Sequence, residues 1–313
     1  MTDKGERAPR VSIGLAVFNG EKYLEAAIES ILAQTFEDFE LIISDNASTD
    51  RTGEICKKYA ARDSRIRYSR NETNIGGANN ENLTFRLSRG EYFRWAAHDD
   101  ICAPRLLERC VEVLDSHPEV VLCHSAVVEI DENGTPQRTQ MRSEGSAGSP
   151  FHRFRRLTTR VHKCEATYGL MRSAVLRKTR LQLNYTDSDR VLLCELALHG
   201  PFYQIAEPLF FKRFHSGNRY KDWRGRMAWF LPELQNTGKI TFPNWLQLFD
   251  YFATVGRVSM PWSQKALCYT WMGGPWMVVN GQRLVKDLLV GAYMFAQPRE
   301  RRQDKYKKVD QWI

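Results

Sequence analysis

Short apolar segments alternate with segments of helical spacing over residues 11–125, and this alternation limits the possible folds more than any other feature of the chain. An almost continuous apolar run predicts a buried strand, whereas apolar residues three and four apart predict a helix. A strand–helix repeat of this kind predicts a parallel sheet with right-handed crossovers and helices on both faces. The expected strands are residues 11–17, 39–44, 65–69, 91–96 and 120–125.

Three of these strands stop abruptly in polar residues: VSIGLAVFNGEKYL (11–24), ELIISDNASTD (40–50) and EYFRWAAHDD (91–100). Ligands bind open parallel sheets at the carboxyl ends of the strands, where loops and helix N-termini converge. We therefore expect the three strand ends to form one site. The adjacent carboxylates of Asp99 and Asp100 are the most informative part, because they are costly after an apolar strand unless a positive group binds there.

Asp99 and Asp100 suit a divalent cation. Mg²⁺ and Mn²⁺ prefer oxygen ligands and often bind through one or two carboxylates together with phosphate oxygens. Such a metal would neutralise the charge that builds on a leaving diphosphate. The structural alternative is that one of the two aspartates only caps the helix expected near Pro104.

The other polar segments also have both a binding and a structural interpretation. Asp45, at the end of the second strand, could accept a hydrogen bond from a nucleobase N–H, although a helix cap explains part of segment 45–50. Asn74 and Gly76 belong to the sequence N-I-G-G-A, whose glycines allow a ligand to approach the backbone closely. This sequence is not G-x-G-x-x-G, so a dinucleotide-binding fold is a poor match.

The composition restricts the cellular setting and the partners. A net charge of +8 is compatible with anionic ligands or an acidic membrane surface, and nucleic acid is the least favoured partner. The cysteine count of seven is odd and contains no C-x-x-C, which argues against a disulfide framework or a zinc ribbon. A reducing compartment is therefore favoured. The polar start MTDKGERAPR lacks the apolar core of a signal peptide, so we expect a cytoplasmic protein.

Beyond residue 125 the pattern is less regular. The sequence DENG (131–134) predicts a hairpin turn. Phe202–Ala206 and Leu209–Phe214 are expected to form a strand pair divided by Glu207-Pro208.

The motifs taken together resemble a family 2 glycosyltransferase with a GT-A fold. Their order and spacing agree over residues 11–125 and more weakly to about residue 216. One departure is Ala97, which stands where the metal motif of that family has its first aspartate. The residues that carry the resemblance are Phe18, Asn19, Glu21, the run Gln34-Thr35-Phe36, the run Asp45 to Asp50, Asn74, Gly76, Ala78, Asn82, and His98-Asp99-Asp100.

The resemblance implies an inverting, hexosyltransferase-like enzyme that uses a nucleoside-diphosphate sugar, a hydroxyl-bearing acceptor and a divalent cation, Mn²⁺ or Mg²⁺. UDP or dTDP is the favoured nucleotide because an aspartate suits a pyrimidine N3–H, and GDP stays open. A GT-A-type, mostly parallel, Rossmann-like sheet flanked by helices is expected over residues 1–218, with a helical, aromatic-rich C-terminal extension over 219–313. The residues implied in donor binding are Phe18, Asn19, Glu21, Asp45, Asn74, Gly76, Asp99 and Asp100.

Three further roles follow from the resemblance. Asp99 is the implied metal ligand, and His215 is a second one, although a plain loop histidine fits that position equally well. Asp189 is the implied catalytic base, with Asp187 as its rival and a helix cap as the structural alternative. The segment Tyr168–Arg172 resembles the part of the family that lines the sugar and acceptor pocket.

Two other functions stay open at this point. A nucleotidyltransferase has a similar sheet, but it usually carries a Gly-rich loop with Arg or Lys after the first strand, which residues 18–24 lack. A nucleotide-sugar-binding protein without catalysis is suggested by Ala97. Fold alone does not separate these functions.

The C-terminal region is rich in aromatic residues and is expected to form helices on the catalytic domain. It could hold a lipid-linked acceptor, or it could be core or a homodimer face. A helix with apolar residues 288–296, followed by the charge run RERRQDKYKK (299–308), could lie on the inner face of a membrane. A C-terminal helix with a solvated tail is the simpler interpretation. The aromatic residues are Trp223, Trp229, Phe230, Trp245, Phe249, Tyr251, Phe252, Trp262, Trp271 and Trp276.

Overall fold

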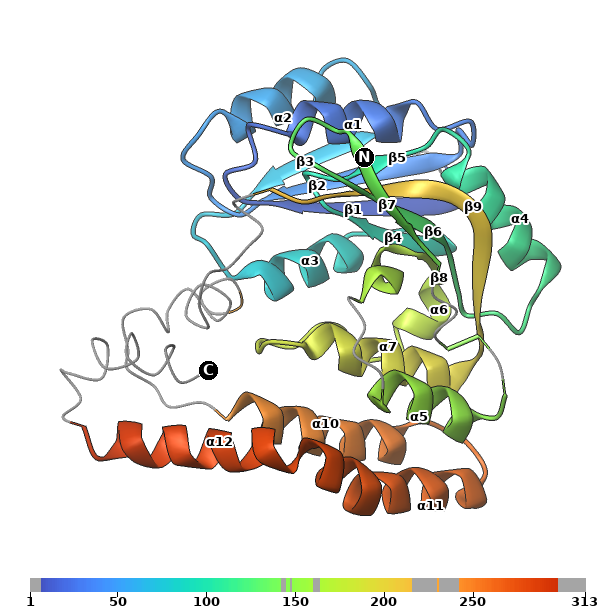
Figure 1. Cartoon of the computed structure of the whole chain (residues 1–313). Coiled ribbons are helices and arrows are strands. Elements are labelled where there is room, and N and C mark those ends of the chain that lie inside the picture. Colours follow the sequence, from blue (N-terminus) through green and yellow to red (C-terminus); the bar gives the residue numbers. More distant parts are fainter. Residues whose placement is uncertain are drawn as a thin grey trace, which may run out of the picture.

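The structure is a computed structural model that describes residues 7–141, 145–146, 148–159, 164–215, 230 and 242–297. Within these residues, nine strands form one mixed sheet in the order β3-β2-β1-β4-β8-β6-β9-β5, with β7 paired to β6 (Figure 1). The strands are β1 (Val11–Val17), β2 (Phe39–Asp45), β3 (Ile66–Arg70), β4 (Tyr92–Ala96), β5 (Ile101–Cys102), β6 (Leu122–Ile130), β7 (Pro136–Gln140), β8 (Leu170–Arg172) and β9 (Phe202–Arg213).

Helices cover both faces of this sheet, as the strand–helix alternation predicts. They are α1 (Leu24–Leu32), α2 (Thr52–Ala60), α3 (Gly77–Arg86), α4 (Leu106–Ser116), α5 (Pro150–Thr159), η1 (Glu165–Tyr168), α6 (Ser173–Leu176), α7 (Ser188–His199), α10 (Pro243–Arg257), α11 (Trp262–Trp271), η3 (Met272–Trp276) and α12 (Met277–Phe295). Alternate residues of β4 divide between two cores, with Tyr92 packed on the side of α1, α2 and α4, and Trp95 on the side of α3 and α7.

The first half of the sheet agrees with the sequence prediction. Strands β3, β2, β1 and β4 are parallel to one another. Val17 pairs with Asp45 at the carboxyl ends of β1 and β2, and Leu15 of β1 pairs with Ala96 of β4. The three polar strand ends therefore emerge at the same edge of the sheet, which confirms the predicted GT-A-type arrangement of this half.

The second half of the sheet is mixed, and it differs from the expectation at β9. Strand β9 is one continuous strand parallel to β6, so the predicted strand pair is wrong. The register shifts opposite Ser125–Val127, where Pro208 pairs with Ala126. A bulge of this kind accommodates a residue that has no N–H for the ladder, so the proline bends the strand without ending it. The predicted turn at 131–134 is confirmed, because it joins the antiparallel strands β6 and β7.

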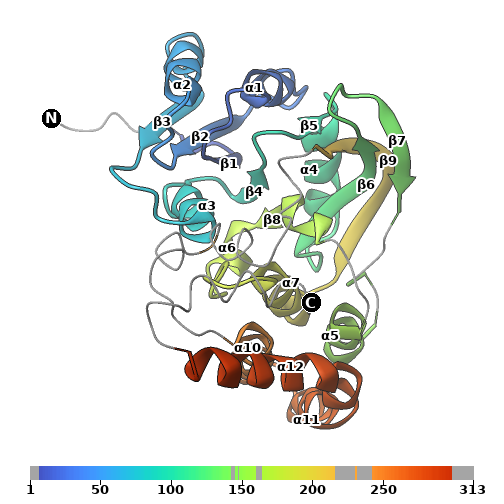
Figure 2. The same ribbon diagram turned by 60° about the vertical axis from the view of Figure 1, so that its left-hand side comes forward.

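The C-terminal helices α10, α11 and α12 lie beyond α5 and α7, on the side away from the sheet (Figures 1 and 2). Tyr251 of α10 is buried against the ring of Phe154 in α5, with the ring centroids 5.8 Å apart. The predicted boundary at 218–219, the tryptophans at 223 and 229, and the charge run 299–308 lie outside the described residues. Among the helices described, none is long and apolar enough to cross a membrane.

Gly14 of β1 allows α3 to pack directly on the sheet, and we expect its replacement by Ala to destabilise the protein. A Cβ at this position would lie 2.1 Å from Thr84 Oγ1 and 2.8 Å from Phe93 Cζ. Overpacking of a filled core costs about 1–3 kcal/mol, so Gly14→Ala should lower the denaturant midpoint clearly.

Gly281 of α12 provides the matched control for this substitution. A Cβ there would meet nothing within 4 Å, so Gly281→Ala should gain up to about 1 kcal/mol from helix propensity. Equal midpoints for the two variants would contradict the close approach of α3 to β1.

Candidate active site

The loops that follow β1 and β2 are tied together by hydrogen bonds. The backbone N–H of Asn19 donates to Ser48 Oγ (2.9 Å), and Asn19 Oδ1 accepts from the N–H of Thr49 (2.8 Å). Glu21 Oε2 accepts from the N–H of Arg51 at 3.0 Å, beside the start of α2. Asn19 and Glu21, both implied in donor binding, thus shape this edge of the sheet, while Phe18 stands 45% exposed beside them.

Asp45 at the end of β2 is fully buried and has several partners. Its Oδ1 accepts from the N–H of Ser48 (2.8 Å), and its Oδ2 accepts from the hydroxyl of Tyr68 (3.0 Å). Arg70 Nη1 lies 3.6 Å from the same Oδ2, and the Asp45 side chain has no exposed surface. A nucleobase would therefore reach Asp45 only after some of these partners move.

The start of α3 is fixed by an amide network from the end of β2. Asn46 Nδ2 donates to Asn74 Oδ1 (2.8 Å), and Asn46 Oδ1 accepts from the N–H of Ile75 (2.9 Å). Asn74 Oδ1 also accepts from the N–H of Gly76, whose φ of 86° lies in the region that favours glycine. Asn74 and Gly76 therefore hold the N-terminus of α3 next to the carboxyl end of β2.

Asp99 and Asp100 are buried where β4 ends, and the end of β9 is bonded to them. Asp100 Oδ1 accepts from the backbone N–H of Arg213 (2.8 Å), and Arg213 Nε donates to the carbonyl of Asp99 (2.9 Å). His215 Nε2 lies 3.0 Å from Asp99 Oδ2, although 116 residues separate them in the chain. The two predicted metal ligands are therefore neighbours in the fold.

Aromatic and basic side chains close this corner of the site. The Tyr23 ring lies 4.8 Å from the His215 ring and 4.7 Å from the guanidinium carbon of Arg213. Burial lowers the pKa of His98, against the opposite influence of the Asp99 charge. The lowered pKa disfavours the charged form of His98, so His98 supplies less positive charge to the acidic pair than an ordinary histidine.

The residues at the end of β4 fit a divalent cation that substrate phosphates help to hold. Asp99 and His215 supply one carboxylate and one imidazole. The described part of the chain contains no cluster of three or more His, Cys, Asp or Glu side chains that could hold a metal without further ligands. Mg²⁺ and Mn²⁺ sites with one or two protein ligands complete their coordination with phosphate oxygens and water. This donor set therefore suits a metal that arrives with a diphosphate.

The buried state of Asp100 predicts an unusual pH dependence of stability. Burial first, and then the charge of Asp99, raises the pKa of Asp100 to about 7. An acid with a raised pKa favours the folded state at low pH, and this contribution is lost as the pH rises through the folded pKa. Asp100→Asn should therefore stabilise the metal-free protein at pH 8 by up to about 4 kcal/mol, and have little effect near pH 4.

Thermal unfolding of the metal-free protein between pH 4 and pH 8 checks this prediction, with Asp131→Asn as a control of opposite sign. Asp131 accepts hydrogen bonds from the N–H groups of Asn133 and Thr135, which lower its pKa. Asp131→Asn should lose stability at neutral pH, and that loss should fade in acid. A constant effect of Asp100→Asn at every pH would show that folding does not raise the pKa of Asp100.

Asp189 lies at the start of α7 and is partly buried. Its Oδ1 accepts from the N–H of Arg190 at 2.8 Å. Burial first, and then the charge of Asp187, raises the pKa of Asp189. Asp187, the rival base, is exposed at the N-cap with a φ of 65°. A carboxylate with a raised pKa is better matched to proton abstraction near neutral pH than an ordinary aspartate.

Glu81 of α3 is an acidic neighbour of Asp189 that the sequence analysis missed. Its carboxylate accepts a hydrogen bond from the side chain of Gln182, just before α7. Burial, and then the charge of Asp189, raises the pKa of Glu81 to about 8. In the sequence, Glu81 lies between the motif residues Ala78 and Asn82, on the helix that follows N-I-G-G. This position is the signal by which sequence reasoning could have found Glu81.

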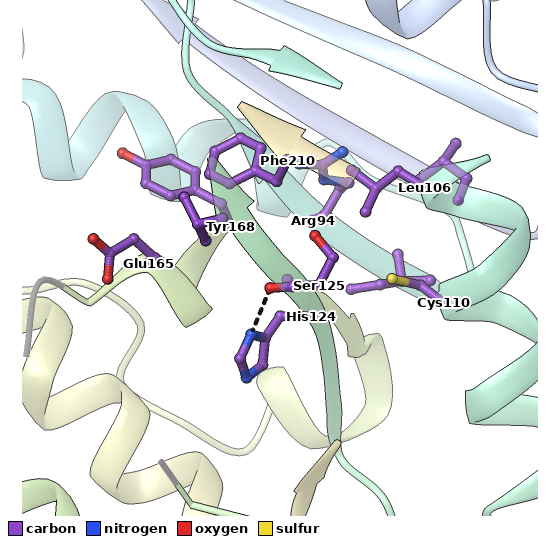
Figure 3. Close-up of a pocket in the computed structure, with 12 residues that line it drawn as sticks. Arg94, Leu106, Cys110, His124, Ser125, Glu165, Tyr168 and Phe210 are labelled. Carbon is purple, nitrogen blue, oxygen red and sulfur yellow. Dashed lines mark hydrogen bonds between the residues drawn. The ribbon is translucent and has the colours of Figure 1, made fainter. Parts of the chain in front are cut away.

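Tyr168 lies between the two acidic parts of the site. Burial, and then the charges of Glu81, Asp100, Asp99 and Asp189, raises the pKa of its hydroxyl. Its ring packs against Phe210 of β9, with the centroids 5.7 Å apart (Figure 3). The segment that begins at Tyr168 was expected to line the acceptor pocket, and its first residue lies between the end of β4 and the start of α7.

Behind the acidic pair, Arg94 of β4 lines a small cavity together with Ser125, Glu165 and Phe210 (Figure 3). Its side chain is buried, and neither Nε nor Nη2 has a hydrogen-bond partner among the residues that the structure describes. The Arg94 charge acts to lower the pKa of Asp100, against the larger effect of burial. Sequence reasoning missed Arg94 because an arginine inside an apolar strand gives no periodic signal.

Comparison with known proteins gives a family and several relatives. The family model described as glycosyl transferase family 2 matches residues 12–180. The chain is 38% identical over 128 residues to the uncharacterized glycosyltransferase MJ1057 of Methanocaldococcus jannaschii, a match that covers 40% of this chain and 44% of that one. It is also 38% identical over 127 residues to the putative glycosyltransferase EpsE of Bacillus subtilis, covering 40% and 46% of the two chains. The chain thus spans less than half the length of these relatives.

Two solved structures have a similar fold. Staphylococcus aureus TarS in complex with UDP-GlcNAc has a TM-score of 0.57 at 16% identity, covering 96% of this chain and 92% of that one. The mannosyltransferase PcManGT of Pyrobaculum calidifontis, in complex with GDP-Man and Mn²⁺, has a TM-score of 0.53 at 17% identity, covering 93% and 77%. At these identities the likeness concerns the fold.

Proposed function

The chain belongs to glycosyl transferase family 2, and we propose that it moves a sugar from a nucleoside-diphosphate sugar to an acceptor hydroxyl with inversion at the anomeric carbon. One observation carries the proposal. The carboxyl pair Asp99 and Asp100 follows β4, Asp189 lies in the first turn of α7, and η1, which ends at Tyr168, contacts both β4 and α7. The charges of these carboxylates also raise the pKa of Tyr168. A sugar placed over Tyr168 would have its diphosphate near the end of β4 and its acceptor near α7.

Asp189 is the proposed base. The acceptor oxygen attacks the anomeric carbon while Asp189 takes the hydroxyl proton, and the bond from that carbon to the diphosphate oxygen breaks on the opposite face. A single displacement of this kind inverts the configuration. The raised pKa of Asp189 supports this role, because a base acts best when its pKa lies near the working pH.

Asp99 and His215 are the proposed holders of a divalent cation. His215 Nε2 and Asp99 Oδ2 lie 3.0 Å apart, which supports the binding of one cation by both side chains. Mn²⁺ and Mg²⁺ are both suitable cations. The cation, when bound, would neutralise charge on the leaving diphosphate. Ala97 removes one carboxylate from this corner, so Asp99 carries most of the metal affinity in this proposal.

The proposed donor is linked to UDP or dTDP, because Asp45 can accept from the N3–H of a pyrimidine. Arg70 must then turn away from Asp45, to which it lies within 3.6 Å. A thermal-shift series with UDP, dTDP and GDP, each with and without Mn²⁺, tests this assignment. A ligand that binds the native state raises the midpoint, and we expect UDP or dTDP to raise it more than GDP.

The proposed location is the cytoplasm, and the proposed acceptor is an amphipathic or lipid-linked molecule. All seven cysteines are buried and none is in a disulfide, which supports a reducing compartment. The aromatic C-terminal helices support an acceptor with an apolar part.

A nucleotide-sugar-binding protein without catalysis is the second candidate, and Ala97 is the observation that favours it. Titration calorimetry with UDP and Mn²⁺, combined with an assay of donor hydrolysis, separates the two functions. Binding together with slow hydrolysis supports the enzyme. Binding with no hydrolysis or transfer of any donor supports the binding protein.

A further inference from the structure

The outward side of α12 is an exposed apolar surface, and we propose that it docks the protein on an anionic membrane surface. We call this surface the α12 face. Its residues are 37–82% exposed. They recur at spacings typical of one side of a helix, whereas Leu284, Gly291 and Met294 are buried on the opposite side. The α12 face consists of Val278, Val279, Val285, Leu288, Leu289 and Tyr293.

The charges around the α12 face are basic. Arg283 is exposed and Lys286 half-buried on this helix. The helix's acidic residue, Asp287, is buried, and its two carboxylate oxygens accept 2.8 Å hydrogen bonds from the backbone and side chain of Asn244. The sequence that follows, 298–313, contains six Lys or Arg and three Asp or Glu. An apolar face with basic neighbours complements anionic lipid headgroups.

Helix α11 also carries exposed apolar side chains. Trp262 is 74% exposed and Leu267 is 46% exposed, and α11 and α12 both lie in the outer layer of helices, away from the sheet (Figure 2). Over residues 242–297 the acidic residues are Asp250 and Asp287, and Asp250 is bonded to Arg180 and Tyr185. Tryptophan is favoured at the boundary between water and lipid, where one end of its ring system is apolar and the other is wet.

A second copy of the chain is a weaker candidate for the α12 face. A two-fold contact places the same surface patch on both sides of the interface. Such an interface would gather Arg283 and Lys286 of both copies, and the acidic residues of the described C-terminal helices, Asp250 and Asp287, are already hydrogen-bonded. Phosphatidylglycerol headgroups supply the missing negative charge, so lipid explains both the apolar and the basic residues.

Sedimentation of the purified full chain with lipid vesicles tests the proposal without using enzyme activity, so its failure is distinct from failure of the proposed function. We expect binding to phosphatidylcholine vesicles that contain phosphatidylglycerol, weaker binding to phosphatidylcholine alone, and loss of binding at high salt. Leu289→Glu, at a residue 66% exposed, should reduce binding at least about tenfold. Met141→Glu is the matched control, because Met141 is 63% exposed and lies outside the C-terminal helices.

Circular dichroism and the thermal midpoint establish that both variants are folded. Failure of the wild-type chain to bind anionic vesicles would overturn the proposal, and so would equal losses for Leu289→Glu and Met141→Glu. Light scattering supplies the remaining outcome. A dimer that Leu289→Glu dissociates, with no vesicle binding by the wild-type chain, would identify the α12 face as an interface between copies.

Discussion

Replacement of Asp189 with Asn should lower kcat about a thousandfold, the middle of the range for loss of a general base. The amide has nearly the same shape but cannot take the acceptor proton. It can still accept the hydrogen bond from the N–H of Arg190, so the start of α7 should stay folded. Donor affinity should change little, because the role proposed for Asp189 is on the acceptor side. Steady-state transfer rates and UDP titrations measure the two effects separately.

Asp187→Asn is the matched control for this experiment. Asp187 lies two residues earlier, is exposed, and was the rival base. Its replacement should leave kcat within about threefold of wild type, which corresponds to a barrier change below about 1 kcal/mol. A large loss with Asp187→Asn and a small one with Asp189→Asn would transfer the role of base to Asp187.

The pH profile of the wild-type enzyme provides a second measurement on the same residue. The base must be ionised, so kcat/KM should rise with pH and level off above its pKa. Because burial and Asp187 raise the pKa of Asp189, this rise should lie above the pH range of an ordinary aspartate. In Asp189→Asn the rise should disappear from the residual rate.

Replacement of Asp99 with Asn should have the second largest effect, and it should appear in binding. The variant removes the negative charge that faces His215 at 3.0 Å. We expect the affinity for UDP in the presence of Mn²⁺ to fall at least about thirtyfold, equivalent to about 2 kcal/mol, and the affinity without Mn²⁺ to change little. Titration calorimetry with UDP, with and without MnCl₂, gives both values.

Asp63→Asn is a suitable control for Asp99→Asn. Asp63 is a half-buried aspartate paired with Arg65 at 2.7 Å, and it precedes β3, at the opposite edge of the parallel strands from their carboxyl ends. Its replacement should leave both UDP affinities unchanged. Equal UDP affinities for Asp99→Asn and wild type in Mn²⁺ would remove Asp99 as the metal ligand and leave Asp100 as the alternative.

The parts of the site that sequence reasoning identified are those with local signals. Asp45 and the Asp99–Asp100 pair follow apolar strands directly, and parallel strands end at one edge of a sheet, so their proximity could be expected from periodicity alone. Asp189 was predicted from the helix that it begins and from a family resemblance, and its role as base stays a prediction. Strands β1, β2 and β4 are largely apolar segments between helical ones, whereas the polar β3 (IRYSR) was expected from its place in the strand–helix alternation.

The parts that were missed depend on contacts between distant segments. Arg213 bonds to Asp99 and Asp100 from more than 110 residues away, and this contact fixes the end of β9. Glu81 lies beside Asp189 only because α3 and the start of α7 share one face of the sheet. Strand β5 has two residues and exists through its pairing with β9, so it leaves no periodic pattern. Contacts of this kind are set by topology rather than by local sequence.

The most direct test of the account is ³¹P NMR of nucleoside-diphosphate sugars incubated with the wild-type chain, Mn²⁺ and acceptor candidates. At least one donor should release a nucleoside diphosphate, and Asp189→Asn should bind the same donor without forming the nucleoside diphosphate. Release of a nucleoside monophosphate together with a sugar 1-phosphate would contradict sugar transfer, because the broken bond would then lie within the diphosphate and not at the anomeric carbon.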